Sequence, residues 1–341
     1  MHRWRLVLLG AIAAAALATT LALTLSAGAG TTKGYKIFLL PKTTTIPVFT
    51  VNAKGARTAA KELGDTLTYN GPTDISGPKQ VPFIDSAARQ GYDGIIISTP
   101  DANAVAPALK RAMAKGVKVV SYDADVAPDS RTIFVAPSSN KLIGTIEVKW
   151  AYDLTKGKGD IAILSATPTS PNQNTWIKFM KQELAKSKYK NMHLVKVAYG
   201  NDDPTDSAKQ TQALVQAYPN LKAIIAPTTV GIQAAAQELS QEGKCGKIQL
   251  TGLGLPSDMR KYVKKGCANK FGLWDEENFG YLAEYVIHNV VAGKLTGKIG
   301  QSFTAGHLGK FKVVVSDGNK PVVVLGPPIA FTPQNIDKYH F

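Results

Sequence analysis

The chain has 341 residues, of which 44% are hydrophobic and 19% are charged. These are values of globular proteins, and they exclude an intrinsically disordered chain. The formal net charge of +15 comes from 40 basic and 25 acidic residues. The lysines are scattered along the chain rather than clustered with aromatic residues, so we expect a solvated basic surface and no nucleic-acid partner.

The N-terminus is typical of a targeting signal. A basic start with Arg3 and Arg5 precedes an apolar run from Leu6 to Ala27 that ends in small residues, as in secretory signal peptides. We therefore predict that residues 1–32 direct export to the periplasm or to the outer face of the cytoplasmic membrane. Because the apolar run is also long enough to span a bilayer, a retained anchor stays open as the alternative to a cleaved signal.

Beyond this segment, strand and helix patterns alternate with short connections marked by Gly and Pro, as in βαβ units. Runs of Val and Ile without alternation predict strands that are covered on both faces, and therefore parallel sheets. The expected strands are 35–40, 66–69, 94–97, 118–122, 131–135, 161–164, 194–199, 223–226, 248–251, 270–273, 311–315 and 322–325. The expected helices are 48–63, 79–90, 104–115, 142–154, 176–184, 207–218, 232–242, 258–265 and 279–291.

The alternating pattern restarts after residues 135–139, which are typical of a segment that crosses between two domains. We therefore predict an α/β fold with two doubly wound parallel-sheet lobes joined by a hinge. The first lobe is expected to comprise residues 33–137 and about 275–306, and the second lobe residues 138–274 and about 307–341. The length of the chain allows two domains of ordinary size.

Five of the expected strands end at residues that are suited to hold a small hydroxylated molecule. In parallel α/β sheets, ligands bind beyond the carboxyl ends of the strands, so five such ends in both halves of the chain predict one cleft between the lobes. Carboxylates and amides form strong or paired hydrogen bonds with hydroxyl groups, and aromatic faces pack on C–H groups. The candidate binding residues are Lys42, Phe49, Asp123, Asn172, Gln173, Pro227, Thr229 and Trp274.

Patterns typical of catalysis or cofactor binding are scarce. The five histidines are far apart and lack the spacing of metal ligands. The segment 252–256 follows a strand but lacks the third glycine of a dinucleotide-binding turn. Asp123 and Asp125 are spaced as a carboxylate pair, but no second acidic cluster joins them, which favours hydroxyl binding over catalysis. We therefore expect a protein without enzymatic activity, metal or cofactor.

The two cysteines, Cys245 and Cys267, each precede an expected strand. If those strands are neighbours, both cysteines lie at the amino edge of the sheet, where an oxidising compartment permits a disulfide. We predict that the two residues are joined. The alternative is a pair of buried free thiols.

Three segments, 163–176, 226–231 and 251–257, together with Pro41-Lys42 and 122–125, resemble the exported sugar-binding proteins of ABC importers with the type I periplasmic-binding fold. The similarity extends from about Tyr35 to Phe341 and is greatest to two groups, the rhamnose-binding proteins and the autoinducer-2 receptors. By this resemblance, the ligand positions of the autoinducer-2 receptors correspond to Lys42, Asp123, Asn172, Gln173, Pro227 and Thr229. Those receptors have an aspartate at the position of Asn172, and the three quoted segments are more similar to the rhamnose-binding group.

The resemblance implies an exported solute-binding protein that captures a deoxyhexose such as rhamnose and delivers it to the permease subunits of an ABC importer. Binding is expected to close the two lobes about the hinge, and we expect a monomer. The alternatives are an autoinducer-2 receptor of the same fold and a sugar sensor that partners a membrane kinase. Asp123→Ala is expected to abolish sugar binding while leaving the fold intact.

Overall fold

Seven strands form the largest of four sheets in the computed structural model, which describes residues 34–341. The strand order is β13-β14-β5-β4-β3-β1-β2, and every pair is parallel except β13 with β14. The strands are β1 (Lys36–Leu40), β2 (Thr66–Tyr69), β3 (Gly94–Ile97), β4 (Lys118–Tyr122), β5 (Ile133–Ala136), β13 (Val314–Ser316) and β14 (Asn319–Val324). The predicted signal segment, residues 1–32, lies outside the described residues.

Two pairs of helices cover the faces of this sheet. The helices are α1 (Pro47–Leu63), α2 (Gly77–Arg89), α3 (Ala102–Ala114) and α9 (Glu276–Val291). Ile95 and Ile97 of β3 pack in one apolar cluster with residues of α2 and α3, whereas Ile96 packs in another cluster with residues of α1 and α9. Because successive side chains of a strand point to opposite faces, the helices lie on both sides, as the unalternated apolar runs predict.

The second sheet has four parallel strands in the order β7-β6-β8-β9. They are β6 (Gly159–Ser165), β7 (Met192–Tyr199), β8 (Leu221–Ala226) and β9 (Gln249–Gly252), with the helices α4 (Asn140–Thr155), α5 (Pro171–Leu184), α6 (Pro204–Ala217), α7 (Thr229–Gln241) and α8 (Pro256–Lys264). Helix α4 packs against α5, and α6 packs against α7. The predicted α/β class with parallel sheets is confirmed.

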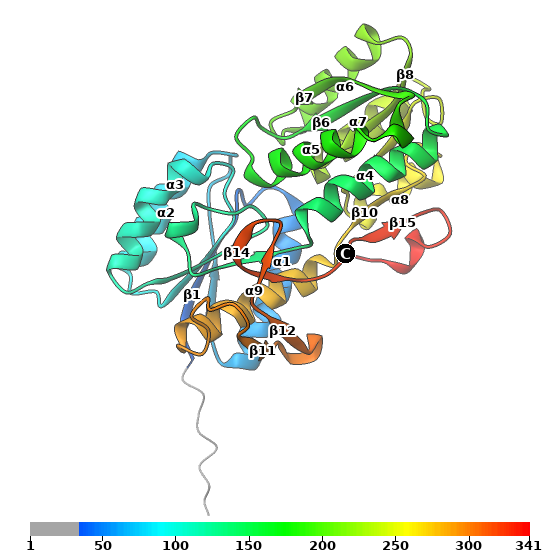
Figure 1. Ribbon diagram of the computed structural model, residues 1–341. Helices are drawn as coiled ribbons and strands as arrows, with labels where there is room; N and C mark the ends of the chain where they lie inside the picture. The colour runs from blue at the N-terminus through cyan, green and yellow to red at the C-terminus, as the bar shows by residue number, and fades with distance from the viewer. Residues whose placement is uncertain (1–33) are drawn as a thin grey trace, which may run out of the picture. The chain divides into compact units, whose positions relative to one another are not determined.

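The chain passes between the two sheets three times (Figure 1). It leaves the first sheet between Ala136 and Asn140, at the expected crossing segment, and returns between β10 (Phe271–Leu273) and α9. It leaves again after β14, and β15 (Ile329–Phe331) then pairs with β10. The sequence placed residues 307–324 in the second lobe, and this part of the assignment is corrected, because β14 pairs with β5 of the first sheet.

Several helices begin earlier than the apolar periodicity predicts. Helix α5 begins at Pro171 rather than at residue 176, and α7 begins at Thr229 rather than at residue 232. Proline is well suited to the first position of a helix, where its missing N–H leaves no hydrogen bond unmade. The earlier starts place Asn172, Gln173 and Thr229 in the first turns of these helices.

The short strands near the C-terminus were predicted only in part. A hairpin of β11 (Ser302–Thr304) and β12 (Lys310–Lys312) forms a separate two-stranded sheet. Strands β11 and β15 were not predicted. Among the helices of residues 34–341, none is both long and apolar enough to cross a membrane.

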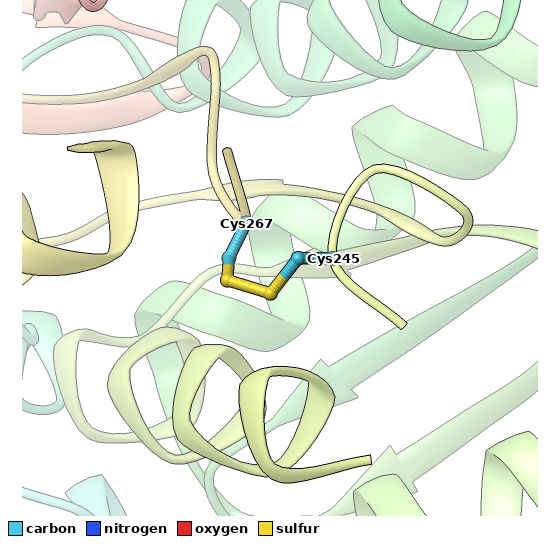
Figure 2. Close-up of a disulfide and its surroundings, with 2 residues drawn as sticks. All are labelled: Cys245 and Cys267. Carbon is cyan, nitrogen blue, oxygen red and sulfur yellow. A yellow bond between two sulfur atoms is a disulfide. The ribbon is translucent and has the colours of Figure 1, made fainter. Parts of the chain in front are cut away.

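The structure contains the predicted disulfide between Cys245 and Cys267 (Figure 2). The two residues are separated by 22 positions, and their Cα atoms are 4.2 Å apart. They lie just before β9 and β10, which are linked by a bridge between Leu253 and Gly272. The disulfide therefore ties together the segments that lead into the two strands nearest the return crossing.

Removal of this disulfide is expected to destabilise the protein. In the chain-entropy account, closing a loop of this length lowers the entropy of the unfolded chain by an amount equivalent to about 3 kcal/mol. The double variant Cys245→Ser, Cys267→Ser should therefore lose about that much free energy of unfolding in a denaturant titration. Intact mass after alkylation without reductant gives the direct check, because two labelled thiols in the wild-type protein would contradict the pairing.

Glu147 is a buried carboxyl on α4 that is isolated from other polar groups. Its side chain has 0% exposure, and neither carboxyl oxygen has a hydrogen-bond partner among residues 34–341. Burial raises the pKa of this carboxyl well above its ordinary value. The folded protein therefore holds a proton on Glu147 that the unfolded chain releases as the pH rises.

Glu147 is expected to make stability fall with rising pH. Because the folded state binds the proton more tightly, the free energy of unfolding decreases as the pH rises from the ordinary glutamate range toward the folded-state pKa. Glu147→Gln should raise the melting temperature near neutral pH and leave it almost unchanged at about pH 4, where glutamate is largely protonated in either state. Glu242→Gln, at an exposed position, is the control. Equal pH profiles for the wild type and Glu147→Gln would contradict this account.

Candidate ligand-binding site

The carboxyl ends of strands from both sheets surround one cavity. It encloses about 430 Å³ of empty space, its mouth included. All eight candidate residues predicted from the sequence line it: Lys42, Phe49, Asp123, Asn172, Gln173, Pro227, Thr229 and Trp274. The structure thus brings the candidates together, and their role in holding a ligand stays a prediction.

On the side of the first sheet, a buried ion pair joins the ends of β1 and β4. The Nζ atom of Lys42 lies 2.9 Å from Oδ2 of Asp123, with side-chain exposures of 5% and 15%. The hydroxyl of Ser98, which follows β3, also donates to Asp123 Oδ2 at 2.7 Å. Buried charges need such partners because desolvation penalises them strongly. The pair is therefore fixed at the ends of three adjacent strands.

Asp123 adopts a backbone conformation that few residues tolerate. Its φ angle is 56°, which lies in the left-handed region that favours glycine and, among the other residues, Asn and Asp. The left-handed residue directly follows the end of β4 at Tyr122. The sequence could not show the turn, but it explains why an aspartate can occupy the position.

Asn172 and Gln173 bring amide groups from the first turn of α5. Asn172 Nδ2 donates to Asp123 Oδ1 at 3.1 Å, which joins the second lobe directly to the first. Gln173 Oε1 accepts from the hydroxyl of Ser165 and from the backbone N–H of Ala166, both at 2.7 Å. Because these bonds hold the Gln173 oxygen against the end of β6, its NH₂ group is the donor available to the cavity.

The end of β8 and the start of α7 supply backbone groups. The Thr228 hydroxyl caps α7 by accepting from Gly231 N–H at 3.4 Å. Thr229 is the first residue of that helix, so its N–H has no acceptor within the helix. Pro227 and Thr229 therefore place a carbonyl and a free N–H on the same wall.

Aromatic rings form the apolar part of the wall. Phe49 and Trp274 are each 4% exposed, and the ring of Trp274 lies 6.2 Å from the rings of Trp176 and Phe279. Trp176 also lines the cavity and was not among the predicted residues. Its position is fixed by a hydrogen bond from its indole N–H to Asn140 Oδ1 at 2.8 Å. A ligand with C–H or methyl groups can pack against these rings.

The cavity is also lined by two acidic residues that were not predicted from the sequence, Asp202 and Glu276. Glu276 accepts a hydrogen bond from Asn52 Nδ2 at 2.6 Å. Burial, together with the negative charge of Asp123, raises the pKa of Glu276 well above its ordinary value. Asp202 follows β7 in the sequence Gly200-Asn-Asp, a polar strand end like the five that were recognised. The same pattern, applied to the expected strand 194–199, could have found it.

Asp125 lies outside this site. Its carboxylate accepts from Arg131 Nε at 2.6 Å and from Arg131 Nη2 at 2.7 Å. The spacing of Asp123 and Asp125 therefore does not produce a carboxylate pair. Within residues 34–341, no three His, Cys, Asp or Glu side chains are grouped so as to hold a metal ion.

The sequence matches the family described as "Periplasmic binding protein domain" over residues 37–295. The fold is similar to that of an ABC transporter solute-binding protein from Clostridium phytofermentas with bound L-rhamnose. The TM-score is 0.87 and the identity 34%, over 90% of this chain and 98% of that one.

Two further solved structures are similar over most of their length. A sugar ABC transporter protein from Actinomyces odontolyticus is 41% identical, with a TM-score of 0.72, over 90% of this chain and 98% of that one. LsrB from Clostridium saccharobutylicum in complex with AI-2 is 26% identical, with a TM-score of 0.84, over 90% of this chain and all of that one. The resemblance inferred from the sequence is confirmed.

Replacement of Asp123 is expected to affect both binding and stability. Asp123→Ala leaves Lys42 buried without its partner and puts alanine at a positive φ, so the free energy of unfolding should fall by about 3–5 kcal/mol. The expectation of an intact fold is thereby revised to a destabilised one. Asp123→Asn keeps an acceptor and suits the left-handed turn, so it should be less destabilising while still weakening ligand binding.

Denaturant unfolding of both variants checks the stability, and calorimetric titration with sugar checks the binding. Equal stability of Asp123→Ala and the wild type would show that the ion pair and the turn contribute nothing. Unchanged affinity in both variants would remove Asp123 from the binding site.

Proposed function

Since the chain belongs to the periplasmic binding protein family, we propose that it is exported and delivers a deoxyhexose such as rhamnose to the permease subunits of an ABC importer. Its relatives are sugar-binding transport proteins, and it is a binding protein rather than an enzyme. The proposal concerns the identity of the ligand, the place of action and the partner.

The observation that carries the proposal is that hydrogen-bond donors, hydrogen-bond acceptors and aromatic rings together line the cavity. A sugar hydroxyl both donates and accepts hydrogen bonds, so a sugar site needs acceptors and donors side by side. The cavity has carboxylate acceptors at Asp123 and Asp202, and donors at Lys42, at the amide of Gln173 and at the first turn of α7. The rings of Phe49, Trp176 and Trp274 add the apolar surface that the methyl group of a deoxyhexose requires.

Two observations support a rhamnose-like ligand over AI-2. Asn172 is an amide that donates a hydrogen bond to Asp123. The autoinducer-2 receptors, which this chain resembles, have an aspartate at the corresponding position. The rhamnose-bound relative is also more similar in sequence, at 34% identity, than the AI-2-bound one at 26%.

An autoinducer-2 receptor is the second candidate. It is favoured by the similarity to LsrB in complex with AI-2 and by the arrangement of Lys42, Asp123 and Gln173 around one cavity. The change at Asn172 places it second.

The hydrogen bond between Asn172 and Asp123 also bears on closure. These residues belong to opposite lobes and contact each other directly, while three crossings connect the sheets. A ligand that bonds to both lobes adds interactions only in the closed arrangement, so binding shifts the population toward closure.

We expect L-rhamnose or a close deoxyhexose to raise the melting temperature of the protein. A ligand that binds only the native state at one hundred times its dissociation constant stabilises that state by about 2.7 kcal/mol. A thermal-shift screen of monosaccharides and AI-2, followed by calorimetric titration, measures this. Tighter binding of AI-2 than of every hexose tested would reverse the ranking of the two candidates.

The variant Asn172→Asp sharpens the same test. It replaces the amide donor with a second carboxylate beside Asp123, and like charges this close disfavour each other. Sugar affinity should therefore fall, and the preference should shift toward AI-2 by about 1–2 kcal/mol, the scale of one hydrogen bond to a charged group. Asn191→Asp, which makes the same change at an exposed position, is the control and should leave both affinities unchanged.

A further inference from the structure

Asp202 lines both the cavity and a groove that adjoins it. A wider groove of about 1780 Å³ of empty space continues beyond the cavity, and Asp202 and Ile46 line both. Ile46 comes from the first lobe and Asp202 from the second. Asp202 and Ile46 therefore lie where the cavity adjoins the groove.

The turn that carries Asp202 is held in a rarely adopted conformation. Asn201 and Asp202 both have left-handed backbones, with φ angles of 56° and 49°. Backbone bonds from Gly200 N–H to the Ser165 carbonyl and from Asn201 N–H to the Ala166 carbonyl, both 2.8 Å, fix this turn against the end of β6. The turn thus has a defined position next to the residues that lead into Asn172 and Gln173.

Asp202 is not needed to cap the helix that follows it. The neighbouring Asp203 does so, because its Oδ1 accepts from Asp206 N–H at 2.8 Å. The side chain of Asp202 instead accepts from the hydroxyl of Thr228 through Oδ1. Its carboxylate is therefore anchored by one oxygen at the cavity wall, and the other oxygen is available to a ligand.

Two other side-chain acceptors of the second lobe at this wall already accept hydrogen bonds from the protein itself. Asn172 Oδ1 accepts from Gln173 N–H at 2.9 Å, and Gln173 Oε1 accepts two hydrogen bonds from the end of β6. Each sugar hydroxyl that faces this lobe also needs an acceptor for its proton. Asp202 is the charged group in the cavity wall that can provide it from this lobe.

The charges around Asp202 are consistent with this role. Burial raises the pKa of Asp202 above its ordinary value, and the positive charge of Lys42, from the opposite lobe, together with the Thr228 hydrogen bond, offsets part of this rise. Lys42 therefore acts on two carboxylates, Asp123 of its own lobe and Asp202 of the second lobe. With one cation and two such carboxylates, the wall disfavours acidic sugars, because a further negative charge would be repelled.

We infer that Asp202 is the ligand acceptor of the second lobe, that it replaces the carboxylate lost at Asn172, and that it restricts the site to neutral sugars. The inference rests on the proposed function. It assigns to the strand end of β7 a binding role that the resemblance to the autoinducer-2 receptors does not include.

The test compares three variants by calorimetric titration with L-rhamnose, or with the sugar that the screen identifies. Asp202→Asn suits the left-handed turn and keeps the Thr228 bond, but it presents an NH₂ group in place of the second oxygen. Asp202→Ala removes both oxygens. Both variants should bind about 10- to 100-fold more weakly. Asp203→Asn, which removes the same charge one residue away and retains a good cap, should bind as the wild type does.

A series of monodeoxy sugars separates direct contact from a structural effect. If one hydroxyl bonds to Asp202, the sugar that lacks it should bind equally to the wild type and to Asp202→Asn, whereas other deoxy sugars retain the difference. A loss that is the same for every deoxy sugar, or for Asp203→Asn, would overturn the inference. An affinity of Asp202→Asn equal to that of the wild type would also overturn the inference, but this result would not contradict the proposed function. A wild-type protein that binds no neutral sugar would overturn both.

Galacturonate and glucuronate test the restriction to neutral sugars. The wild type should bind them at least tenfold more weakly than the preferred neutral sugar. In Asp202→Asn that ratio should shrink, because one repelling charge is gone. A wild type that prefers a uronate would overturn the restriction.

Discussion

The carboxylate of Asp123 is the constraint around which the candidate site is arranged. It accepts from Lys42 and Ser98 of the first lobe and from Asn172 of the second. A carboxylate so little exposed is stable only when donors replace the water it has lost. The donors must therefore converge on one point, and they follow the ends of three strands, β1, β3 and β6, whereas Asp123 itself follows β4. Parallel topology makes this convergence possible, because the carboxyl ends of neighbouring strands meet at one edge.

The sequence predicted the features that depend on local pattern. Unalternated apolar runs correctly indicated parallel strands, and polar residues at strand ends indicated the cavity that Asp123, Asn172 and Trp274 line. The sequence could not predict that β14 returns to the first sheet, since strand order follows from tertiary packing rather than from local pattern. It placed the starts of α5 and α7 too late, because Pro171 and the capping residue Thr228 begin these helices several residues before the apolar periodicity is established. Glu276 was missed for a similar reason, since its burial results from the packing of α9 against α1.

The position of Glu276 depends on the close packing of α1 against α9. An ideal Cβ atom at Gly55 would lie 1.8 Å from the Glu277 carbonyl oxygen, and one at Gly280 would lie 1.9 Å from the Asn52 carbonyl oxygen. Both glycines are therefore required for the two helices to approach this closely. The approach brings Asn52 to Glu276, and Glu276 lies at the point where the chain returns from the second lobe. Helix packing in the first lobe and one wall of the cavity thus share the same residues.

The segments that follow β6 and β7 also fix each other's position. The turn after β7 donates two backbone hydrogen bonds to the segment that leads into α5, so Asp202 and Asn172 are presented from adjacent positions of one edge. A change from carboxylate to amide at Asn172 permits the direct hydrogen bond to Asp123 across the cleft, which two ionised carboxylates could not form without a shared proton or an intervening cation. Under the assignment of Asp202 as an acceptor, the second lobe retains a negative charge at the ligand while gaining this contact between lobes. A deoxyhexose fits both consequences, because its hydroxyls can donate to the relocated carboxylate and its methyl group needs only the aromatic wall.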